Sequence, residues 1–170
     1  MAKRAMAVQI DCYNKQFHTN YQYLIPCNLY GQFPYTEDFE KLHFVNAMIS
    51  RIMRALKNGE KEIILFGSGK PLRQFIWAMD FARAIKHVLE NDIIENLNIA
   101  PDHSQTIAEI AQICLSACHA QDIKIKFDSS LPDGQYRKCA SNKKMKNLLT
   151  NFSFTSLEVG IEKTFKEMTT

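Results

Sequence analysis

The apolar run Tyr23–Gly31 constrains the fold of this chain most, because it is short and stops at a glycine. Runs of this kind form the buried strands of parallel sheets, which other elements cover on both faces. Ligands of open α/β sheets bind outside the carboxyl ends of the strands. The run therefore predicts one buried strand that places Pro26, Cys27 and Asn28 near a ligand. The alternative is a core strand that simply ends in a turn.

Helix and strand patterns alternate along the chain, which predicts an α/β fold. The predicted helices are residues 3–18, 43–58, 79–90, 107–119, 141–149 and 155–167, and the further predicted strands are residues 63–66, 96–100 and 123–127. The strand 63–66 is expected to be buried, and the strand 123–127, in which apolar residues alternate with lysines, is expected to be half-exposed. Apolar periodicity predicts that Leu56 and Ile85 point inward from their helices. Thr106 and Glu109 have the spacing of a capping box at the start of a helix.

The triplet Gly67-Ser68-Gly69 follows the predicted strand 63–66 and indicates a turn. Arg73 comes shortly after it, and an arginine presents a rigid fork of donors to a phosphate. A single arginine in such a place is more often a surface ion-pair partner, so this signal is weak by itself. The G-x-G-x-x-G turn that opens a dinucleotide-binding fold does not occur in the sequence.

Composition limits the classes of function. The 170 residues suffice for one domain with a core, and the net charge of +3 is too small to indicate nucleic-acid binding, although it suits a phosphorylated ligand. The five cysteines match no disulfide framework or metal site, so we expect a reducing, cytoplasmic setting and no metal. Cys114 and Cys118 share a helix face and are expected in the core. No signal peptide or membrane-spanning run occurs, so no membrane partner is expected.

Five segments match, in order, the motifs of one enzyme superfamily. They are Met1–Ala5, like the tail of Tyr-x-x-x-Lys; Ile25–Gly31, like P-T-N-L-Y-G; Leu42–Met48, like S-H-V-x-P-A-L; Phe66–Phe75, like W-G-S-G-T-P-x-R-E-F; and Pro132–Lys138, like P-D-G-T-P-R-K. Together they resemble the C-terminal half of the extended short-chain dehydrogenase/reductases. Within that superfamily, the chain most resembles the GDP-L-fucose synthase family, NADP-dependent epimerase/reductases that act on GDP-4-keto-6-deoxymannose.

The resemblance implies an incomplete Rossmann sheet plus a small α/β substrate-binding domain. Residues 1–31 would be the remnant of the dinucleotide-binding domain, and residues 32–170 the nucleotide-sugar-binding region, partly interleaved with the remnant sheet. Two catalytic residues are implied. Lys3 would hold the nicotinamide ribose and lower the pKa of a catalytic tyrosine, since a nearby ammonium favours phenolate. His43 would be the general acid/base of epimerisation, which an imidazole can perform near neutral pH. Without the family pattern, His43 is more often just a helix-start histidine.

The resemblance also implies binding residues. The implied cofactor contacts are Lys3, Pro26, Cys27 and Leu29. The implied substrate contacts are Asn28 near the sugar and diphosphate, Arg51 and Arg73 on the diphosphate, Phe44, Met48, Leu65 and Phe66 around the base, and Asp133 and Lys138 at the pocket edge.

The chain departs from the family pattern in ways that leave alternatives open. Only Met1 and Ala2 precede Lys3, so the catalytic tyrosine is absent, together with the catalytic serine, the epimerase cysteine and the glycine-rich turn. We therefore expect NADP(H) in the complete enzyme but not on this chain alone. The expected partners are a GDP-sugar and either the missing N-terminal half or a full-length relative, with a homodimer in the complete enzyme. The alternatives are part of a related nucleotide-sugar 4-reductase or epimerase, such as one acting on a GDP-heptose or GDP-deoxyhexose, or a non-catalytic remnant or partner subunit.

Overall fold

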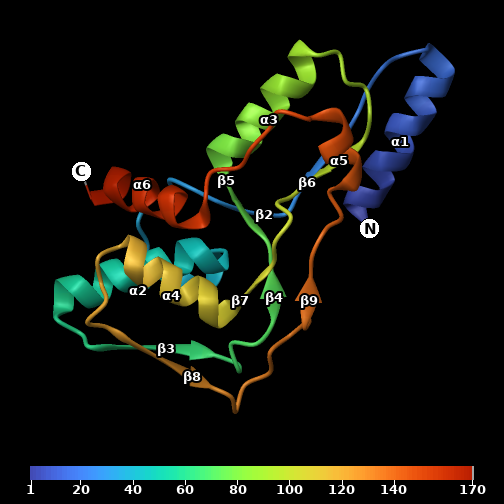
Figure 1. The fold of residues 1–170 in the computed structure, drawn as a ribbon. Helices are drawn as coiled ribbons and strands as arrows, with labels where there is room; N and C mark the ends of the chain where they lie inside the picture. Colours follow the sequence, from blue (N-terminus) through green and yellow to red (C-terminus); the bar gives the residue numbers. More distant parts are fainter. Residues whose placement is uncertain (170) are drawn as a thin grey trace.

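The structure is a computed structural model, and it describes residues 1–169 except for the side chain of Glu40. Helices and strands alternate, and the strands form several small sheets (Figure 1). The helices are α1 (Ala2–Phe17), η1 (Phe39–Lys41), α2 (Phe44–Asn58), α3 (Ala78–Glu90), α4 (Ile107–Ala117), α5 (Lys143–Leu148) and α6 (Leu157–Thr169). The strands are β1 (Leu24–Pro26), β2 (Asn28–Tyr30), β3 (Glu62–Phe66), β4 (Leu72–Arg73), β5 (Phe75–Trp77), β6 (Leu97–Ile99), β7 (Gln105–Thr106), β8 (Lys124–Asp128) and β9 (Arg137–Lys138).

The predicted strand at Tyr23–Gly31 is two strands that belong to different sheets. β1 pairs in parallel with β6, whereas β2 pairs in parallel with β5. The chain changes sheet at Cys27, whose N–H donates to the Ile99 carbonyl. The prediction of parallel pairing is confirmed, but the prediction of one strand buried on both faces is wrong. Ile25 is 50% exposed, because β1 has a strand neighbour on one side only among the described residues.

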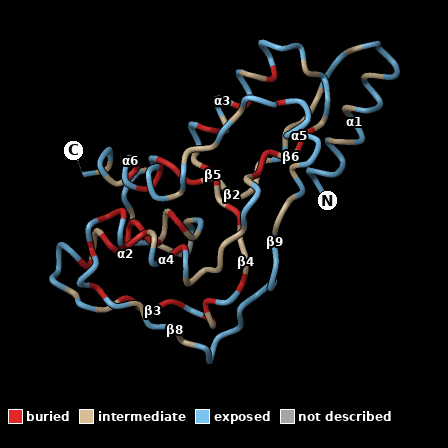
Figure 2. Tube along the Cα trace, in the orientation of Figure 1, coloured by how far each residue is buried: buried red, intermediate tan, exposed pale blue. Residues whose placement is uncertain are grey.

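Two apolar cores lie on either side of these central strands. The larger core joins α2, α4 and α6 to the sheet β3-β8, and the smaller joins α3 and α5 to β5 and β6 (Figure 2). α2 contributes Val45, Met48, Ile49 and Ile52, which share one face of the helix. The helix ends at Gly59, whose φ of 69° is the left-handed conformation that glycine adopts without strain. Leu56 lies at the solvent edge of this face, so the prediction that it points inward is wrong.

The sheet β3-β8 is covered on one face only. Ile63 and Leu65 are buried against the helices, whereas Ile64 and Phe66 alternate with them and are exposed. The prediction of a fully buried strand is therefore wrong for half of its residues. The half-exposed strand predicted at residues 123–127 is confirmed as β8, which starts at Lys124.

Helix α4 begins as its sequence predicts. The Thr106 hydroxyl accepts a hydrogen bond from the Glu109 N–H at 3.1 Å, and the Glu109 carboxylate accepts one from the Thr106 N–H at 2.7 Å. Cys114 and Cys118 are buried on its inward face, as predicted. Ile85 on α3, in contrast, is exposed, so its predicted burial is wrong.

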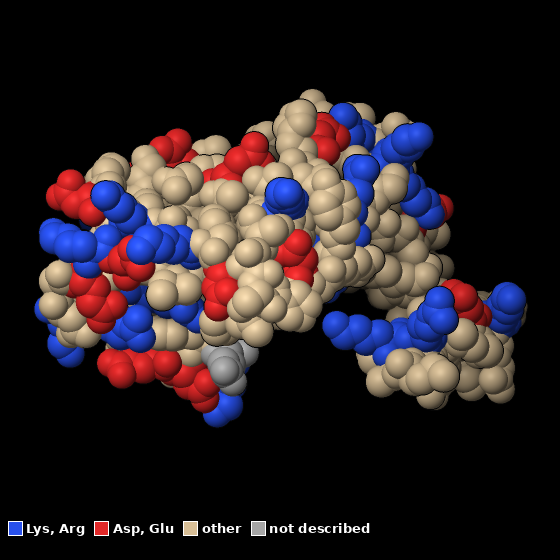
Figure 3. Space-filling view, turned by 90° about the horizontal axis from the view of Figure 1, so that it is seen from below, with Lys and Arg blue, Asp and Glu red and all other residues tan. Residues whose placement is uncertain are grey.

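The predicted N-terminal helix is present as α1, but it lies apart from both cores (Figure 1). None of its residues is buried, and seen from below it forms a lobe of its own (Figure 3). Its apolar stripe includes Tyr13 and Phe17, whose ring centroids lie 5.3 Å apart, and both side chains are exposed. Across residues 1–169, no helix combines the length and apolar character needed to cross a membrane.

Candidate functional site

Arg73 and Lys138 lie opposite each other on neighbouring strands. β4 is the middle strand of a three-stranded sheet, pairing in parallel with β9 and antiparallel with β7. The register pairs Arg73 with Lys138 on one side and with Gln105 on the other. Paired residues share a sheet face, so two cations and an amide form one row of hydrogen-bond donors, which we name the donor row. Arg137 pairs with Leu72 and therefore faces the opposite side.

Within the described part of the chain, the two cations of the donor row have no ion-pair partner. No carboxylate of the described side chains lies within ion-pair distance of Arg73 or Lys138. One guanidinium N–H of Arg73 donates to the Leu72 carbonyl at 2.8 Å, which leaves further donors of that group for another acceptor. Two neighbouring cations repel each other, and an anion bound between them would reverse that repulsion.

The turn predicted at Gly67-Ser68-Gly69 is confirmed, and it is bonded to Asp133. Gly67 and Gly69 have φ values of 84° and 73°. The Ser68 N–H donates to Asp133 Oδ1 at 2.5 Å and the Ser68 hydroxyl donates to Asp133 Oδ2 at 2.7 Å. These two bonds, the hydroxyl bond first, hold the pKa of Asp133 below its ordinary value. A Cβ at position 67 would lie 2.5 Å from Asp133 Oδ1, so this approach requires glycine.

Gln74 connects the strands around the donor row, and sequence reasoning did not single it out. Its side chain is only 4% exposed; its Nε2 donates to the Pro101 carbonyl at 2.8 Å, and its Oε1 accepts from the Ala140 N–H at 2.7 Å. Its backbone oxygen accepts from the Asn28 side-chain amide at 2.7 Å. Asn28, a predicted substrate contact, is therefore bonded to the residue that directly follows Arg73 in the chain.

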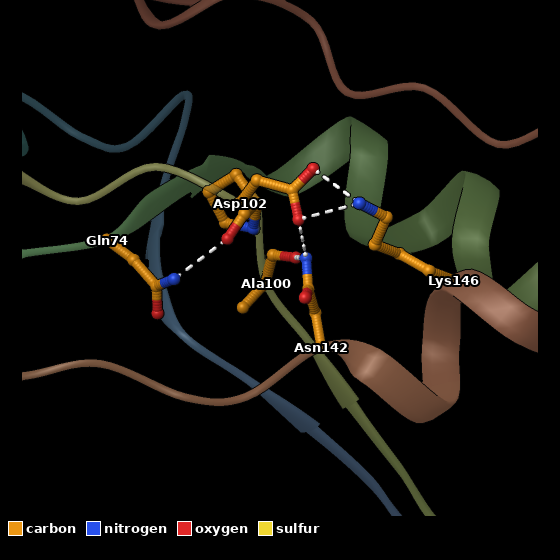
Figure 4. A network of polar contacts seen from close by, with 6 residues as sticks. Gln74, Ala100, Asp102, Asn142 and Lys146 are labelled. Atoms are coloured by element: carbon orange, nitrogen blue, oxygen red, sulfur yellow. Dashed lines mark hydrogen bonds and ion pairs between the residues drawn. The ribbon is translucent and has the colours of Figure 1, made fainter.

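A second polar network holds the segment that follows β9 (Figure 4). The Asp102 carboxylate accepts from Asn142 Nδ2 at 2.9 Å and from Lys146 Nζ at 2.9 and 3.1 Å, and Asn142 also donates to the Ala100 carbonyl. The Asn142 bond is the main reason that the pKa of Asp102 lies below its ordinary value. Helix α5 is thereby tied to the carboxyl end of β6.

Phe75 contacts Phe44, another predicted site residue, close to the donor row. Its ring centroid lies 6.4 Å from that of Phe44, at the start of α2. The three consecutive residues Arg73–Phe75 therefore meet Lys138, Asn28 and Phe44, each through a different contact. His43 directly precedes Phe44 and is exposed at the N-terminus of α2, where its carbonyl accepts from the Ala47 N–H.

Arg51, which is also on α2, is held by contacts with Ile64 and Phe39. Its guanidinium donates to the Ile64 carbonyl at 3.2 Å and lies 4.9 Å from the centroid of the Phe39 ring, and Arg54 lies 5.0 Å from the same ring. Burial, and then the charge of Arg54, lower the pKa of Arg51. Arg54 is paired with Glu60 at 3.4 Å, so Arg51 is the member of this pair of cations with more capacity for an anionic ligand.

The other predicted site residues are more scattered. Phe66 is 63% exposed on the open face of β3, whereas Met48 and Leu65 pack inside the larger core and could affect a ligand only by supporting its surroundings. Pro26, Cys27 and Leu29 lie at the change of sheet, where burial raises the pKa of Cys27 to about 12 and keeps it a neutral thiol. Lys3 is exposed on α1, which lies apart from both cores (Figure 1).

The exposed members of the predicted set do not line a common cavity. An apolar hollow of about 330 Å³ between α2 and α6 is lined by none of the predicted site residues. Another hollow, of about 470 Å³, is lined by Gln105 and so borders the donor row. Within residues 1–169, no group of three or more acidic, histidine or cysteine side chains could hold a metal ion.

Comparisons with known proteins agree on one kind of relative. A model of the NAD dependent epimerase/dehydratase family matches residues 1–100. A probable GDP-L-fucose synthase from Drosophila melanogaster is 34% identical over 97% of this chain and 54% of its own length. A GDP-L-fucose synthase from Dictyostelium discoideum is 32% identical over 95% of this chain and 50% of its own length.

Solved structures give the same picture. The crystal structure of a GDP-L-fucose synthetase from Naegleria fowleri is 29% identical and has a TM-score of 0.86, over 97% of this chain and 52% of that one. A crystal structure of the synthetase from that organism bound to NADP has a TM-score of 0.84. The chain therefore spans about half the length of the relatives that it matches.

Proposed function

Because this chain belongs to the NAD-dependent epimerase/dehydratase family, we propose that it forms the GDP-sugar-binding part of an NADP-dependent 3,5-epimerase/4-reductase that acts on GDP-4-keto-6-deoxymannose. The observation that carries the proposal is the donor row, in which the strand register places Arg73 and Lys138 on one face and no carboxylate among the described side chains pairs with either. A diphosphate would supply that charge, and an arginine can bind it with two parallel hydrogen bonds. The guanosine and the sugar of the proposed ligand are suggested by the GDP-L-fucose synthases that align with nearly all of the chain.

Binding to this chain alone would be weak. A hydrogen bond to a charged group is worth roughly 1.5–3 kcal/mol. On an open surface, solvent and salt reduce that value. The predicted contacts of the base, Phe44, Phe66 and their buried supports Met48 and Leu65, and the predicted diphosphate contact Arg51 would add to the donor row once another segment closes the site.

NADP would bind to the complete enzyme, as it does to the synthetase from Naegleria fowleri. The nicotinamide end of the cofactor would contact Lys3 and the backbone of Pro26, Cys27 and Leu29. The exposed position of Lys3 and the neutral thiol of Cys27 are compatible with such contacts. The cofactor would supply the hydride, and His43 would hold and move the proton during epimerisation. Since the tyrosine that would act with Lys3 is not in this sequence, we expect no turnover by the isolated chain, and turnover above blank with NADPH and the 4-keto GDP-sugar would contradict this.

The expected protein partner is the N-terminal half of the enzyme, or a full-length relative, with a homodimer in the complete assembly. The exposed apolar stripe of α1 supports this expectation, because such surfaces usually mark an interface. The same stripe favours a second candidate function, a non-catalytic subunit that binds a GDP-sugar and docks on a complete enzyme. The reduced cysteines suit the cytoplasm for either function.

Nucleotide preference tests the proposal directly. Ligand-observed NMR with the purified chain should show GDP binding more tightly than UDP and dTDP at the same ionic strength. Binding should weaken as salt is raised, because charged groups on an open surface carry it. If UDP binds better than GDP, or if no diphosphate nucleotide binds, the GDP-sugar assignment is wrong.

A further inference from the structure

The bonds between Ser68 and Asp133 have a consequence for the donor row, and we infer that this clasp is a positioning device that keeps Lys138 opposite Arg73. Ser68 occupies both carboxylate oxygens of Asp133, with its N–H at 2.5 Å and its hydroxyl at 2.7 Å. Asp133, which the motif predicts as a nucleotide contact, then acts on the ligand through Lys138 instead. The identity of the anion rests on the proposed function.

The geometry of the two segments supports this role. Ser68 precedes Arg73 by as many residues as Asp133 precedes Lys138, and the two segments run in parallel. They are joined at one end by the clasp and at the other by the ladder, in which the Leu72 N–H donates to the Tyr136 carbonyl at 2.7 Å. The clasp therefore sets which residue of β9 lies opposite Arg73.

Strand β9 needs such a restraint. It has two residues, both exposed, and β4 is its only strand partner among the described residues. A strand this short at a sheet edge has few interactions of its own to fix its register. A slip by one residue would turn Lys138 to the opposite face and bring Arg137 or Cys139 into its place.

The position of Asp133 also argues against a direct role in reading a base. Its carboxylate closes over Gly67, which has no side chain to exclude it, and Lys70 adds a favourable charge nearby. Both oxygens of this carboxylate accept a bond from Ser68, which fixes the carboxylate toward the turn that leads to β4. The same carboxylate can stay in place when it orders the segment that leads to Lys138.

The test uses Ser68→Ala in the full chain, with Ser130→Ala as a matched control. Ser130 lies three residues before Asp133 and donates its hydroxyl to Asp128 at 2.6 Å, outside the clasp. The first measurement is hydrogen exchange of the Leu72 amide, which reports the β4-β9 ladder without any ligand. Ser68→Ala should speed this exchange about tenfold, which is a modest loss of local stability. Ser68→Thr, which keeps the hydroxyl, should restore protection, and Ser130→Ala should leave it unchanged.

The second measurement is calorimetry with inorganic pyrophosphate and with GDP. Ser68→Ala should weaken both ligands by the same factor, and Lys138→Ala should have little further effect in the Ser68→Ala background, because the two changes remove one interaction. Unchanged Leu72 exchange, or a loss of GDP binding with pyrophosphate binding intact, would overturn the inference, since the second result means that Asp133 reads the base. If GDP shows no preference over UDP, the proposed function fails, while Leu72 exchange still decides whether the clasp sets the register.

Discussion

The side-chain amide of Asn28 donates to the backbone oxygen of Gln74 at 2.7 Å, at the point where the chain passes from β1 to β2. This bond connects the junction between β1 and β2 to the residue that lies between β4 and β5. Gln74 in turn reaches the segments that follow β6 and β9 through its own side chain. One buried amide thus links three strand ends that surround the candidate site.

Replacing Gln74 by leucine should destabilise the fold. The change would leave the Pro101 carbonyl and the Ala140 N–H without their partner, and a buried polar group left unpaired costs about 1–3 kcal/mol. Chemical denaturation should therefore show a lower free energy of unfolding for Gln74→Leu. Gln121→Leu changes an exposed glutamine in the same way and should have little effect. Equal stability of the two variants would contradict the role of Gln74.

Acid should open the Ser68–Asp133 clasp. The pKa of Asp133 is lowered in the folded chain, so its contribution to stability is present above the ordinary carboxyl pKa and disappears as the pH falls through the lowered value. The difference in unfolding free energy between the native chain and Ser68→Ala should therefore shrink over the acid range in which the pH falls below the ordinary carboxyl pKa. A difference that stays constant over this range would show that the ionised carboxylate is not what Ser68 binds.

The free N-terminal helix should make the chain self-associate. Tyr13 and Phe17 are both more than half exposed on its apolar stripe, and exposed apolar surface of this kind promotes association. Light scattering should show concentration-dependent association that Tyr13→Ser with Phe17→Ser reduces. Leu89→Ser, which removes an exposed apolar side chain from α3, is the matched control and should not reduce it. A native chain that stays monomeric across micromolar concentrations would refute this expectation.

Local rules predicted the elements that depend on near neighbours. The capping box of Thr106 and Glu109 is an interaction across one helical turn, and it forms as its spacing predicts. The break at Cys27 could not be predicted in this way, because it depends on β5 and β6, which come much later in the chain. The exposure of Phe66 depends likewise on which face of β3 the helices cover.

The candidate site shows the same division. Motifs indicated Arg73 and Lys138 separately, but only the parallel register of β4 and β9 places them together. Gln74 gave no signal of its own, because the burial of a polar side chain depends on partners that are distant in sequence. The domain division at residue 31 and the catalytic roles of Lys3 and His43 stay predictions.

The central claim is that the face of β4 and β9 with Arg73 and Lys138 binds the diphosphate of GDP, and calorimetry with two matched variants tests it most directly. Arg73→Ala and Arg137→Ala remove the same charge from neighbouring strands but from opposite faces of the sheet. We predict that Arg73→Ala abolishes measurable GDP binding, that Arg73→Lys weakens it because an ammonium cannot present the donor fork, and that Arg137→Ala binds GDP like the native chain. Equal losses in Arg73→Ala and Arg137→Ala would mean that only net charge attracts the nucleotide, and would contradict the claim.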